Sequence, residues 1–232
     1  EGKKAVGLDE REIEEAAVTS KKRSALVQTG SVCRGWCATT NDVTRQKDGG
    51  WARTLYGEEV RIAVKAASGI TNIAQLANKT VATTTGTTSV QLLRKNKRAA
   101  GMDFKELNGK DHSDSFLLLE SGRADAFVMD GPILAGLISK SKTPADYKIV
   151  GEPLSVEPIA IMYRKDDPAF KKAVDDSVRA LAKSGEAAKL YDKWFIQPIP
   201  PANTKVGLAA SDATKAAWAN PSDKPLEEYA QP

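Results

Sequence analysis

Histidine and cysteine, the side chains that most often bind zinc, are almost missing from this sequence. Among 232 residues there is one histidine, His112, and there are two cysteines, Cys33 and Cys37. Two cysteines four positions apart with a single histidine do not make a zinc site. A disulfide between them would need a tight turn and is not expected, so the cysteines leave the redox compartment open. We expect neither a metal nor another cofactor.

Long apolar runs and concentrated charge are also absent. No stretch approaches the roughly 18 apolar residues of a membrane span. The net charge is only +4, and basic residues gather only at Lys95–Arg98, an expected helix end where cations suit the helix dipole. No aromatic residues interleave this cluster, so a nucleic-acid surface is not expected. The sequence starts at Glu1 without Met and shows no signal peptide, which is compatible with processing or trimming.

What the sequence does contain is typical of a globular protein. Hydrophobic residues make up 41% and charged residues 28% of the chain. This length can bury a core and can form one large domain or two small lobes.

The stretch Lys79–Leu93, K-T-V-A-T-T-T-G-T-T-S-V-Q-L-L, is the most informative part of the sequence. Its first residues, Thr80–Thr84, are β-branched and predict a buried strand. Gly86 then ends the strand, and a helix is expected to begin among the hydroxyl residues that follow, Thr87, Thr88 and Ser89. A helix start after a strand directs unpaired N–H groups and partial positive charge at one spot, which suits a carboxylate or phosphate. The alternative is an ordinary helix N-cap.

From Ser68 onward short strands alternate with helical patterns, which favours a parallel, doubly wound α/β sheet. The expected strands are Thr80–Thr84, Phe104–Leu107, Ala124–Met129 and Tyr147–Val150. Helices are expected after Gly86, from a cap at Ser113 or Asp114, and over Ile133–Ile138.

Other elements are expected on both sides of this region. Upstream we expect a strand at Gly2–Leu8, a helix within Asp9–Ala17, a helix over Ser20–Thr29 capped by Ser20, a strand within Val32–Thr40 and an alternating strand within Thr54–Lys65. Downstream we expect a strand at Ile159–Tyr163, a helix from Asp166–Pro168 to Ser184, a second helix with Trp194 on its apolar face, and at most one short helix near Trp218.

Two lobes follow from this order of elements. Residues 66–158 form a complete α/β unit, the second lobe. The flanking segments, 1–65 and 159–232, must pair to form the first lobe with the C-terminal tail, because neither has enough elements for a core. Two connections, near 62–66 and 157–161, would then form a two-strand hinge.

Polar residues at the expected strand ends form a set that suits one kind of ligand, because ligands bind beyond the carboxyl ends of the strands in such sheets. Arginines with hydroxyls suit carboxylates, and an aspartate suits an ammonium group, so the set describes a zwitterion with a second acid group. Each residue also has a simpler explanation, as a solvated arginine, a capping histidine or a loop acid. The set comprises Ser20, Arg23, Thr40, Arg45, Thr88, His112 and Asp130.

Longer motifs resemble a known family. S-G-I-T-N-I-A-Q-L-A-N-K-T-V-A-T-T-T-G-T-T-S resembles the entry to the second lobe of bacterial extracellular solute-binding proteins for polar amino acids. K-D-H-S-D-S-F-L-L-L-E-S-G-R-A-D-A-F-V-M-D-G and S-G-E-A-A-K-L-Y-D-K-W-F-I-Q-P-I-P-P resemble the glutamate/aspartate-binding branch. The resemblance runs from Ser68 to about Asn203 and implies a two-lobed periplasmic-binding-protein-like fold, with doubly wound sheets joined by the hinge.

The resemblance also implies roles for single residues. Arg45, Thr40 and Thr88 would hold the α-carboxylate of the ligand, and Asp130 its α-ammonium. Ser20, Arg23 and His112 would hold the side-chain carboxylate. Ala38 stands where the family usually has serine, so one hydroxyl is lost, although the backbone N–H could still donate.

The function implied is capture of L-glutamate or L-aspartate in the periplasm, closure of the lobes on the ligand, and delivery by a monomer to the membrane permease of an ABC importer. Two alternatives stay open: a dehydratase-like enzyme on the same fold, with Asp130 and His112 as an acid–base pair, and the ligand-sensing module of a receptor. The first lobe departs from the family: Glu1–Val18 is too short for the family's opening strand, helix and strand, and Glu58 and Glu59 stand where the family has an apolar strand. Either segments are missing there or the lobe is altered.

Overall fold

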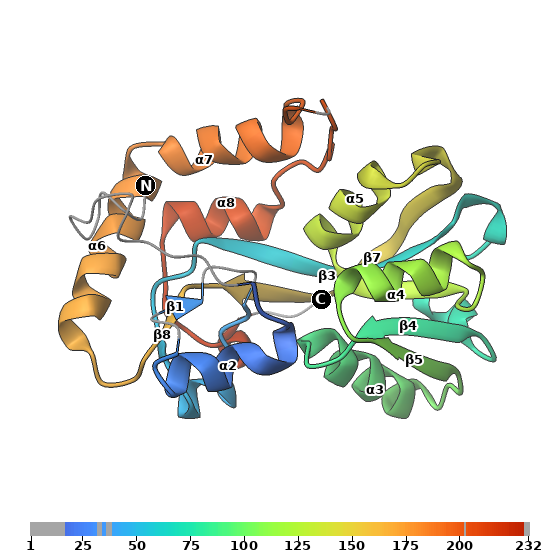
Figure 1. The fold of residues 1–232 in the computed structure, drawn as a ribbon, viewed down its shortest axis with the longest axis horizontal. Helices are drawn as coiled ribbons and strands as arrows, with labels where there is room; N and C mark the ends of the chain where they lie inside the picture. Colours follow the sequence, from blue (N-terminus) through green and yellow to red (C-terminus); the bar gives the residue numbers. More distant parts are fainter. Residues whose placement is uncertain (1–16, 32–33, 36–38, 202, 230–232) are drawn as a thin grey trace. The chain divides into compact units, whose positions relative to one another are not determined.

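The computed structural model describes residues 17–31, 34–35, 39–201 and 203–229 (Figure 1). Contacts divide this part of the chain into two compact units. Unit 1 takes in the described residues of Glu1–Gly57, Glu157–Tyr191 and Ala210–Ala230, and unit 2 those of Glu58–Val156 and Asp192–Ala209. The predicted lobes, 1–65, 66–158 and 159–232, stay a prediction; in the structure residues 192–209 group with unit 2 rather than with unit 1.

Unit 2 is built on a five-stranded sheet with the order β5-β4-β6-β3-β7. The strands are β3 (Tyr56–Lys65), β4 (Thr80–Thr84), β5 (Lys105–Gly109), β6 (Ala126–Asp130) and β7 (Tyr147–Ile159). The helices between them are α3 (Thr88–Ala100), α4 (His112–Glu120) and α5 (Gly131–Lys140). β4 pairs in parallel with β5 and β6, because α3 and α4 return the chain to the same end of the sheet. β3, which precedes the region predicted to form a parallel sheet, is antiparallel to β6, so the sheet as a whole is mixed.

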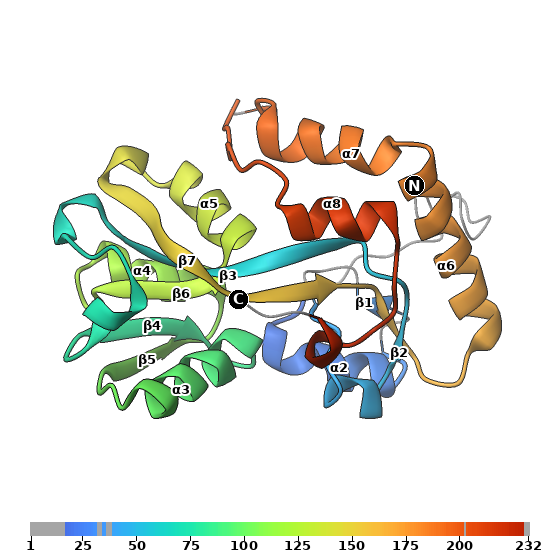
Figure 2. The ribbon, with the colours of Figure 1, turned by 180° about the vertical axis from the view of Figure 1, so that it is seen from behind.

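Two apolar cores cover the two faces of this sheet, which makes it doubly wound (Figures 1 and 2). One core joins Val60, Ile62 and Val64 of β3 to Leu93 of α3. The other contains Ala63 of β3, with Phe116 and Leu119 of α4 and Leu134 of α5. Because side chains alternate along a strand, β3 contributes to both cores, as its alternating sequence predicts.

Unit 1 contains a small antiparallel sheet with the order β1-β8-β2. Its strands are β1 (Arg34–Gly35), β2 (Gly50–Trp51) and β8 (Met162–Tyr163). Its helices are α2 (Ser20–Gln28), α6 (Pro168–Lys183), α7 (Glu186–Tyr191) and α8 (Asp212–Ala219). A core cluster packs Val174 and Val178 of α6 against Ile161 and Tyr163. Unit 1 also contains the 3-10 turns Arg45–Lys47 and Leu226–Glu228. Unit 2 contains the 3-10 turns Ala66–Ser68, Ile73–Leu76 and Pro144–Asp146 and a π-helical turn at Asp192–Ile196.

Several predicted elements are confirmed. β4 spans the predicted Thr80–Thr84. α6 begins at Pro168, where the Asp167 carboxylate accepts a hydrogen bond from the N–H of Phe170. It ends before Gly185, whose φ is +75°, a conformation that suits glycine.

Other details differ from the predictions. The N-cap of α2 is Thr19 rather than Ser20, and that of α4 is Asp111, which accepts from the N–H of Asp114, rather than Ser113 or Asp114. β7 continues far beyond the predicted Val150, and Trp194 is 48% exposed rather than packed on an apolar face. The expectations for Gly2–Leu8, for Asp9–Ala16 within the N-terminal helix, for Cys33 and Cys37, and for Ala38 lie outside the described residues.

Candidate functional site

In unit 1, the first turn of α2 holds one of the two predicted arginines. Ser20 is the first residue of the helix and is half-buried, while Arg23 is only 9% exposed. The guanidinium of Arg23 donates a hydrogen bond from Nη1 to the hydroxyl of Thr39. The positive charge of Arg23 is therefore held inside the unit and directed at the segment that leads to Thr40.

The second arginine lies on the other side of the same segment. Arg45 donates from Nη1 to the backbone carbonyl of Thr40 at 3.0 Å, and its Nε lies 3.4 Å from Oδ2 of Asp42. The backbone N–H of Arg45 also donates to Oδ1 of Asp42 at 2.8 Å. The side chains of Arg23 and Arg45 thus contact two consecutive residues, Thr39 and Thr40. Ala38, the residue before them, lies outside the described residues.

Glu157 is a buried acid that the sequence did not point to. It is 1% exposed on β7, and its carboxylate accepts a hydrogen bond from the Thr40 hydroxyl. A hydroxyl has a single hydrogen, so in this arrangement Thr40 offers a ligand the lone pairs of its oxygen rather than a donor. For Thr40 to donate to a ligand carboxylate, its hydrogen bond to Glu157 must therefore break.

In unit 2, the carboxyl end of β4 leads directly into α3. Thr87 precedes the helix, and its buried hydroxyl donates to the carbonyl of Thr84 at 2.8 Å. Thr88 is the first helical residue and is half-buried. The turn between strand and helix needs Gly86, whose φ is +83°. The predicted helix start is therefore formed, with Thr88 in its first turn, and anion binding there stays a prediction.

His112 begins the next helix of unit 2 and lies beside the end of β4. Its Nδ1 is 3.1 Å from the hydroxyl oxygen of Thr84, which is 2.8 Å from that of Ser115. The Ser115 hydroxyl donates to the carbonyls of Thr83 at 2.9 Å and Asp111 at 3.0 Å, so Thr84 donates to Ser115 and accepts from Nδ1–H of His112. With Nδ1 protonated, Nε2 can donate to an anion only when the ring is cationic.

Close packing at the end of β5 brings this helix start against the sheet. Gly109 pairs with Thr84 across the parallel strands, and a Cβ added to Gly109 would meet the backbone N of Ser115 at 2.6 Å. A larger residue would push α4 away from β4. Gly109 therefore maintains the approach of His112 to Thr84.

Asp130 ends β6 and is the N-cap of α5. It is 4% exposed, which is rare for an aspartate. β4, β5 and β6 are parallel, so their carboxyl ends lie on the same side of the sheet. Thr88, His112 and Asp130 follow or end these strands and therefore lie on that side. Unit 2 thus combines a helix start and an imidazole with a buried carboxylate.

Each unit offers side chains that suit charged ligand groups. Unit 1 offers two oriented guanidinium groups, which bind carboxylates, and unit 2 offers donors for an anion and a carboxylate for a cation. Within the described ranges, no group of three or more His, Cys, Asp or Glu side chains could hold a metal ion. Among the helices of these same ranges, none is both long and apolar enough to cross a membrane.

Comparisons with known proteins agree with this chemistry. Residues 43–205 match a family described as ABC transporter, phosphonate, periplasmic substrate-binding protein. The chain is 42% identical over 224 residues to the glutamate/aspartate import solute-binding protein of Escherichia coli strain K12, covering 97% of this chain and 74% of that protein. It is 40% identical over 226 residues to the L-glutamate/L-aspartate-binding protein of Pseudomonas aeruginosa, covering 97% of this chain and 75% of the relative.

Solved structures share the fold. An ancestral arginine-binding protein bound to glutamine superposes with a TM-score of 0.73 at 26% identity, covering 83% of each chain. The ligand-binding core of GluR0 from Nostoc punctiforme, in complex with L-glutamate, has a TM-score of 0.71 at 24% identity, with 83% of this chain and 86% of that chain covered. This chain belongs to the family of periplasmic substrate-binding proteins of ABC transporters, which are transport proteins and not enzymes.

Proposed function

We propose that this protein binds L-glutamate or L-aspartate and delivers it to the membrane permease of an ABC importer. The observation that carries the proposal is the pair of arginines in unit 1, Arg23 and Arg45, which are anchored to the consecutive residues Thr39 and Thr40. Two guanidinium groups that contact one short segment, Thr39 and Thr40, suit a ligand with two carboxylates. The names of the relatives, glutamate/aspartate import solute-binding protein and L-glutamate/L-aspartate-binding protein, support the same ligand.

The proposal assigns a ligand group to each site residue. The α-carboxylate is held by Arg45, Thr40, Thr88 and the backbone N–H of Ala38, and the α-ammonium by Asp130. The side-chain carboxylate is held by Ser20, Arg23 and His112. The two units act as lobes that close on the ligand, with a hinge where β3 and β7 pass from one unit to the other. The protein works as a monomer in the periplasm.

Calorimetry with the common amino acids tests the ligand. The protein is first unfolded, dialysed and refolded to remove any bound amino acid. We expect glutamate and aspartate to bind, and glutamine and asparagine to bind at least about tenfold more weakly, because each charge-assisted hydrogen bond to a carboxylate is worth about 1.5–3 kcal/mol. Glutamine binding as tightly as glutamate would contradict the assignment. Recovery of the ligand unchanged after long incubation is expected of a binding protein.

A further inference from the structure

A segment near the C-terminus packs across unit 1. We call this segment, residues 221–229, the C-terminal strap. The N–H and the hydroxyl of Thr54 donate to the carbonyl of Ser222 at 2.7 and 2.9 Å. The hydroxyl of Tyr229 lies 3.2 Å from that of Thr54. A single residue in the β2–β3 connection therefore holds both ends of the strap.

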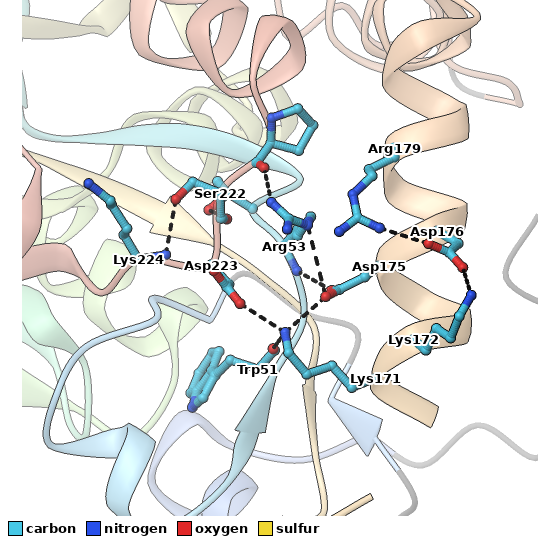
Figure 3. Close-up of polar contacts among 12 residues, drawn as sticks. Trp51, Arg53, Lys171, Lys172, Asp175, Asp176, Arg179, Ser222, Asp223 and Lys224 are labelled. Carbon is cyan, nitrogen blue, oxygen red and sulfur yellow. Dashed lines mark hydrogen bonds and ion pairs between the residues drawn. The ribbon is translucent and has the colours of Figure 1, made fainter. Parts of the chain in front are cut away.

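An ion network fixes the strap to α6 (Figure 3). Lys171 donates to Asp223 of the strap and to Asp175 of its own helix, both at 2.9 Å, and to the carbonyl of Trp51 at 3.1 Å. Partial desolvation lowers the pKa of Lys171, but the hydrogen bonds to Asp175 and Asp223 outweigh it and raise the pKa above its ordinary value. Asp175 also accepts from the backbone N–H of Arg53 at 2.8 Å. The strap is thus tied to both the helix and the β2–β3 connection.

The strap in turn holds Asn41, which lies between two site residues. Asn41 is fully buried, and its polar groups are satisfied by three different segments. The side-chain NH₂ of Asn41 donates to the backbone carbonyls of Asp223 at 3.0 Å and Lys224 at 3.3 Å, both in the strap. The backbone carbonyl of Asn41 accepts from the backbone N–H of Leu226 at 2.7 Å. Its N–H donates to the carbonyl of Pro158 at 2.9 Å, and its Oδ1 accepts from Gln46 at 2.9 Å.

A second contact from the strap reaches the same segment. The carboxylate of Glu227 accepts a hydrogen bond from the backbone N–H of Val43 at 3.1 Å. Asn41 and Val43 flank Asp42, which holds the guanidinium and the N–H of Arg45. The strap therefore fixes the backbone on both sides of the acid that orients this arginine.

We propose that the C-terminal strap is a positioning element of the ligand site, and that Asn41 is the positioning residue through which it acts. The strap sets the backbone of residues 40–45 so that Arg45 is pre-oriented for the ligand α-carboxylate, without touching the ligand itself. Pre-orientation strengthens binding because fewer groups must be ordered when the ligand arrives. This inference rests on the proposed function and adds residues to which the family comparison assigns no role.

The first test compares Asn41→Ala with Val178→Ala, a change in the core of the same unit that leaves the strap contacts intact. Both variants lower the melting temperature, so glutamate binding is measured well below both transitions. Asn41→Ala is expected to weaken binding by about tenfold or more and to speed dissociation, since most affinity changes appear in the off-rate. Val178→Ala is expected to bind like the parent. Equal affinities in the two variants would show that Asn41 acts on stability alone and would overturn the proposal.

The second test needs no buried substitution. Glu227→Ala removes the acceptor of the Val43 N–H, whereas Glu228→Ala removes the same charge from the next residue, which pairs with Lys224 at 3.9 Å. Both side chains are exposed, so both variants are expected to fold. Glu227→Ala should bind glutamate several-fold more weakly than Glu228→Ala, and equal affinities would count against the strap. If the parent protein binds neither glutamate nor aspartate, the proposed function is overturned as well. If the parent binds glutamate and the variants bind it with the same affinity as the parent, only this inference is overturned.

Discussion

At the scale of single residues, Asp130 is the strongest test of how the ligand is held. It is buried at the end of β6, where a negative charge is costly to desolvate and a ligand ammonium would be a matching partner. Removing one partner of such a pair costs about 3–5 kcal/mol, so Asp130→Asn should weaken glutamate binding by at least about 100-fold in calorimetry.

Asp125→Asn is the matched control for this change. Asp125 lies just before β6, is exposed, and accepts from the N–H of Thr80 at 2.8 Å. The substitution removes the same charge far along the strand from Asp130 and keeps an acceptor oxygen. Glutamate should bind this variant within about twofold of the parent. An Asp130→Asn protein that also binds like the parent would make Asp130 a structural acid only.

The contact between His112 and Thr84 predicts a pH-dependent affinity. Nδ1 gives its hydrogen to Thr84, so Nε2 can donate to the ligand side-chain carboxylate only in the cationic ring. An ordinary imidazole loses its charge around pH 6.5, so glutamate affinity should fall from pH 6 to pH 8, by at most about 20-fold. The sign follows from linkage, because the ligand favours the protonated ring and binding must take up a proton that becomes scarce as pH rises.

Calorimetry in buffers of different ionisation enthalpy measures that proton uptake directly. His112→Gln should bind without the pH dependence, and a ligand analogue that lacks the side-chain carboxylate should show none with the parent. Level affinity of the parent from pH 6 to 8 is the outcome that rejects a charged His112.

The site residues differ in how visible they were in the sequence. Arg23, Arg45 and His112 stand near expected helix starts and strand ends, and their joint placement, rather than any one of them, predicts an anion site. Glu157 was not found, because its partner Thr40 lies 117 positions away and a lone acid in a strand carries no local signal. The role of Thr84 was also missed, since a threonine inside a buried β-branched strand has the pattern of a core residue.

At the scale of elements, α6 shows how a buried acid and an exposed acid on one helix differ. Asp175 bridges Lys171 and the backbone of Arg53, and its side chain is 7% exposed. Asp175→Ala should lower the free energy of unfolding in urea by about 1–3 kcal/mol, because it leaves buried donors without their acceptor. Asp176→Ala, one residue along on the exposed side, should leave the urea midpoint almost unchanged. Equal shifts in the two variants would mean that the Asp175 bridge adds no stability.

The tie between the strap and α6 should respond to acid. The hydrogen bond from Lys171 lowers the pKa of Asp223, although partial desolvation opposes it. A lowered folded pKa means that the pair stabilises the protein above the unfolded value of about 3.9 and that this stability is lost as pH falls through the folded value. At neutral pH Asp223→Asn should lower the free energy of unfolding by about 0.5 kcal/mol, since the pair is partly solvated. Urea titrations of parent and variant should converge as the pH falls below the lowered pKa of Asp223 in the folded protein.

The start of α6 was predicted more closely than the end of β7. The start of α6 follows from the Asp-Asp-Pro sequence, because a capping acid and a proline both favour a first helical turn. β7 was predicted only to Val150, since Gly151, Pro153 and Pro158 interrupt the alternating pattern. It continues because it lies at the edge of the sheet, where a proline without an N–H is tolerated and the positive φ of Gly151 bends the strand.

At the scale of the whole molecule, a ligand held by residues of both units should stabilise both. At a free glutamate concentration of about 100 times Kd the stabilisation is about 2.7 kcal/mol, which raises the melting temperature of a chain of this size by about 5–11 °C. Differential scanning calorimetry should show the unfolding of both units moving together. A profile in which one transition shifts and another stays in place would place the ligand on one unit only.

The discontinuity of unit 1 also has a consequence for the order of synthesis. A chain is made from its N-terminus, and the continuous stretch Glu58–Val156 of unit 2 is complete while the parts of unit 1 from Glu157 onward are still missing. The amide of Asn41 meets its partner Lys224 across 183 positions, so the segment that carries Arg45 can make this contact only after residue 224 has been translated. A nascent chain that stops before residue 221 therefore lacks the strap contacts that we propose to position the anion site.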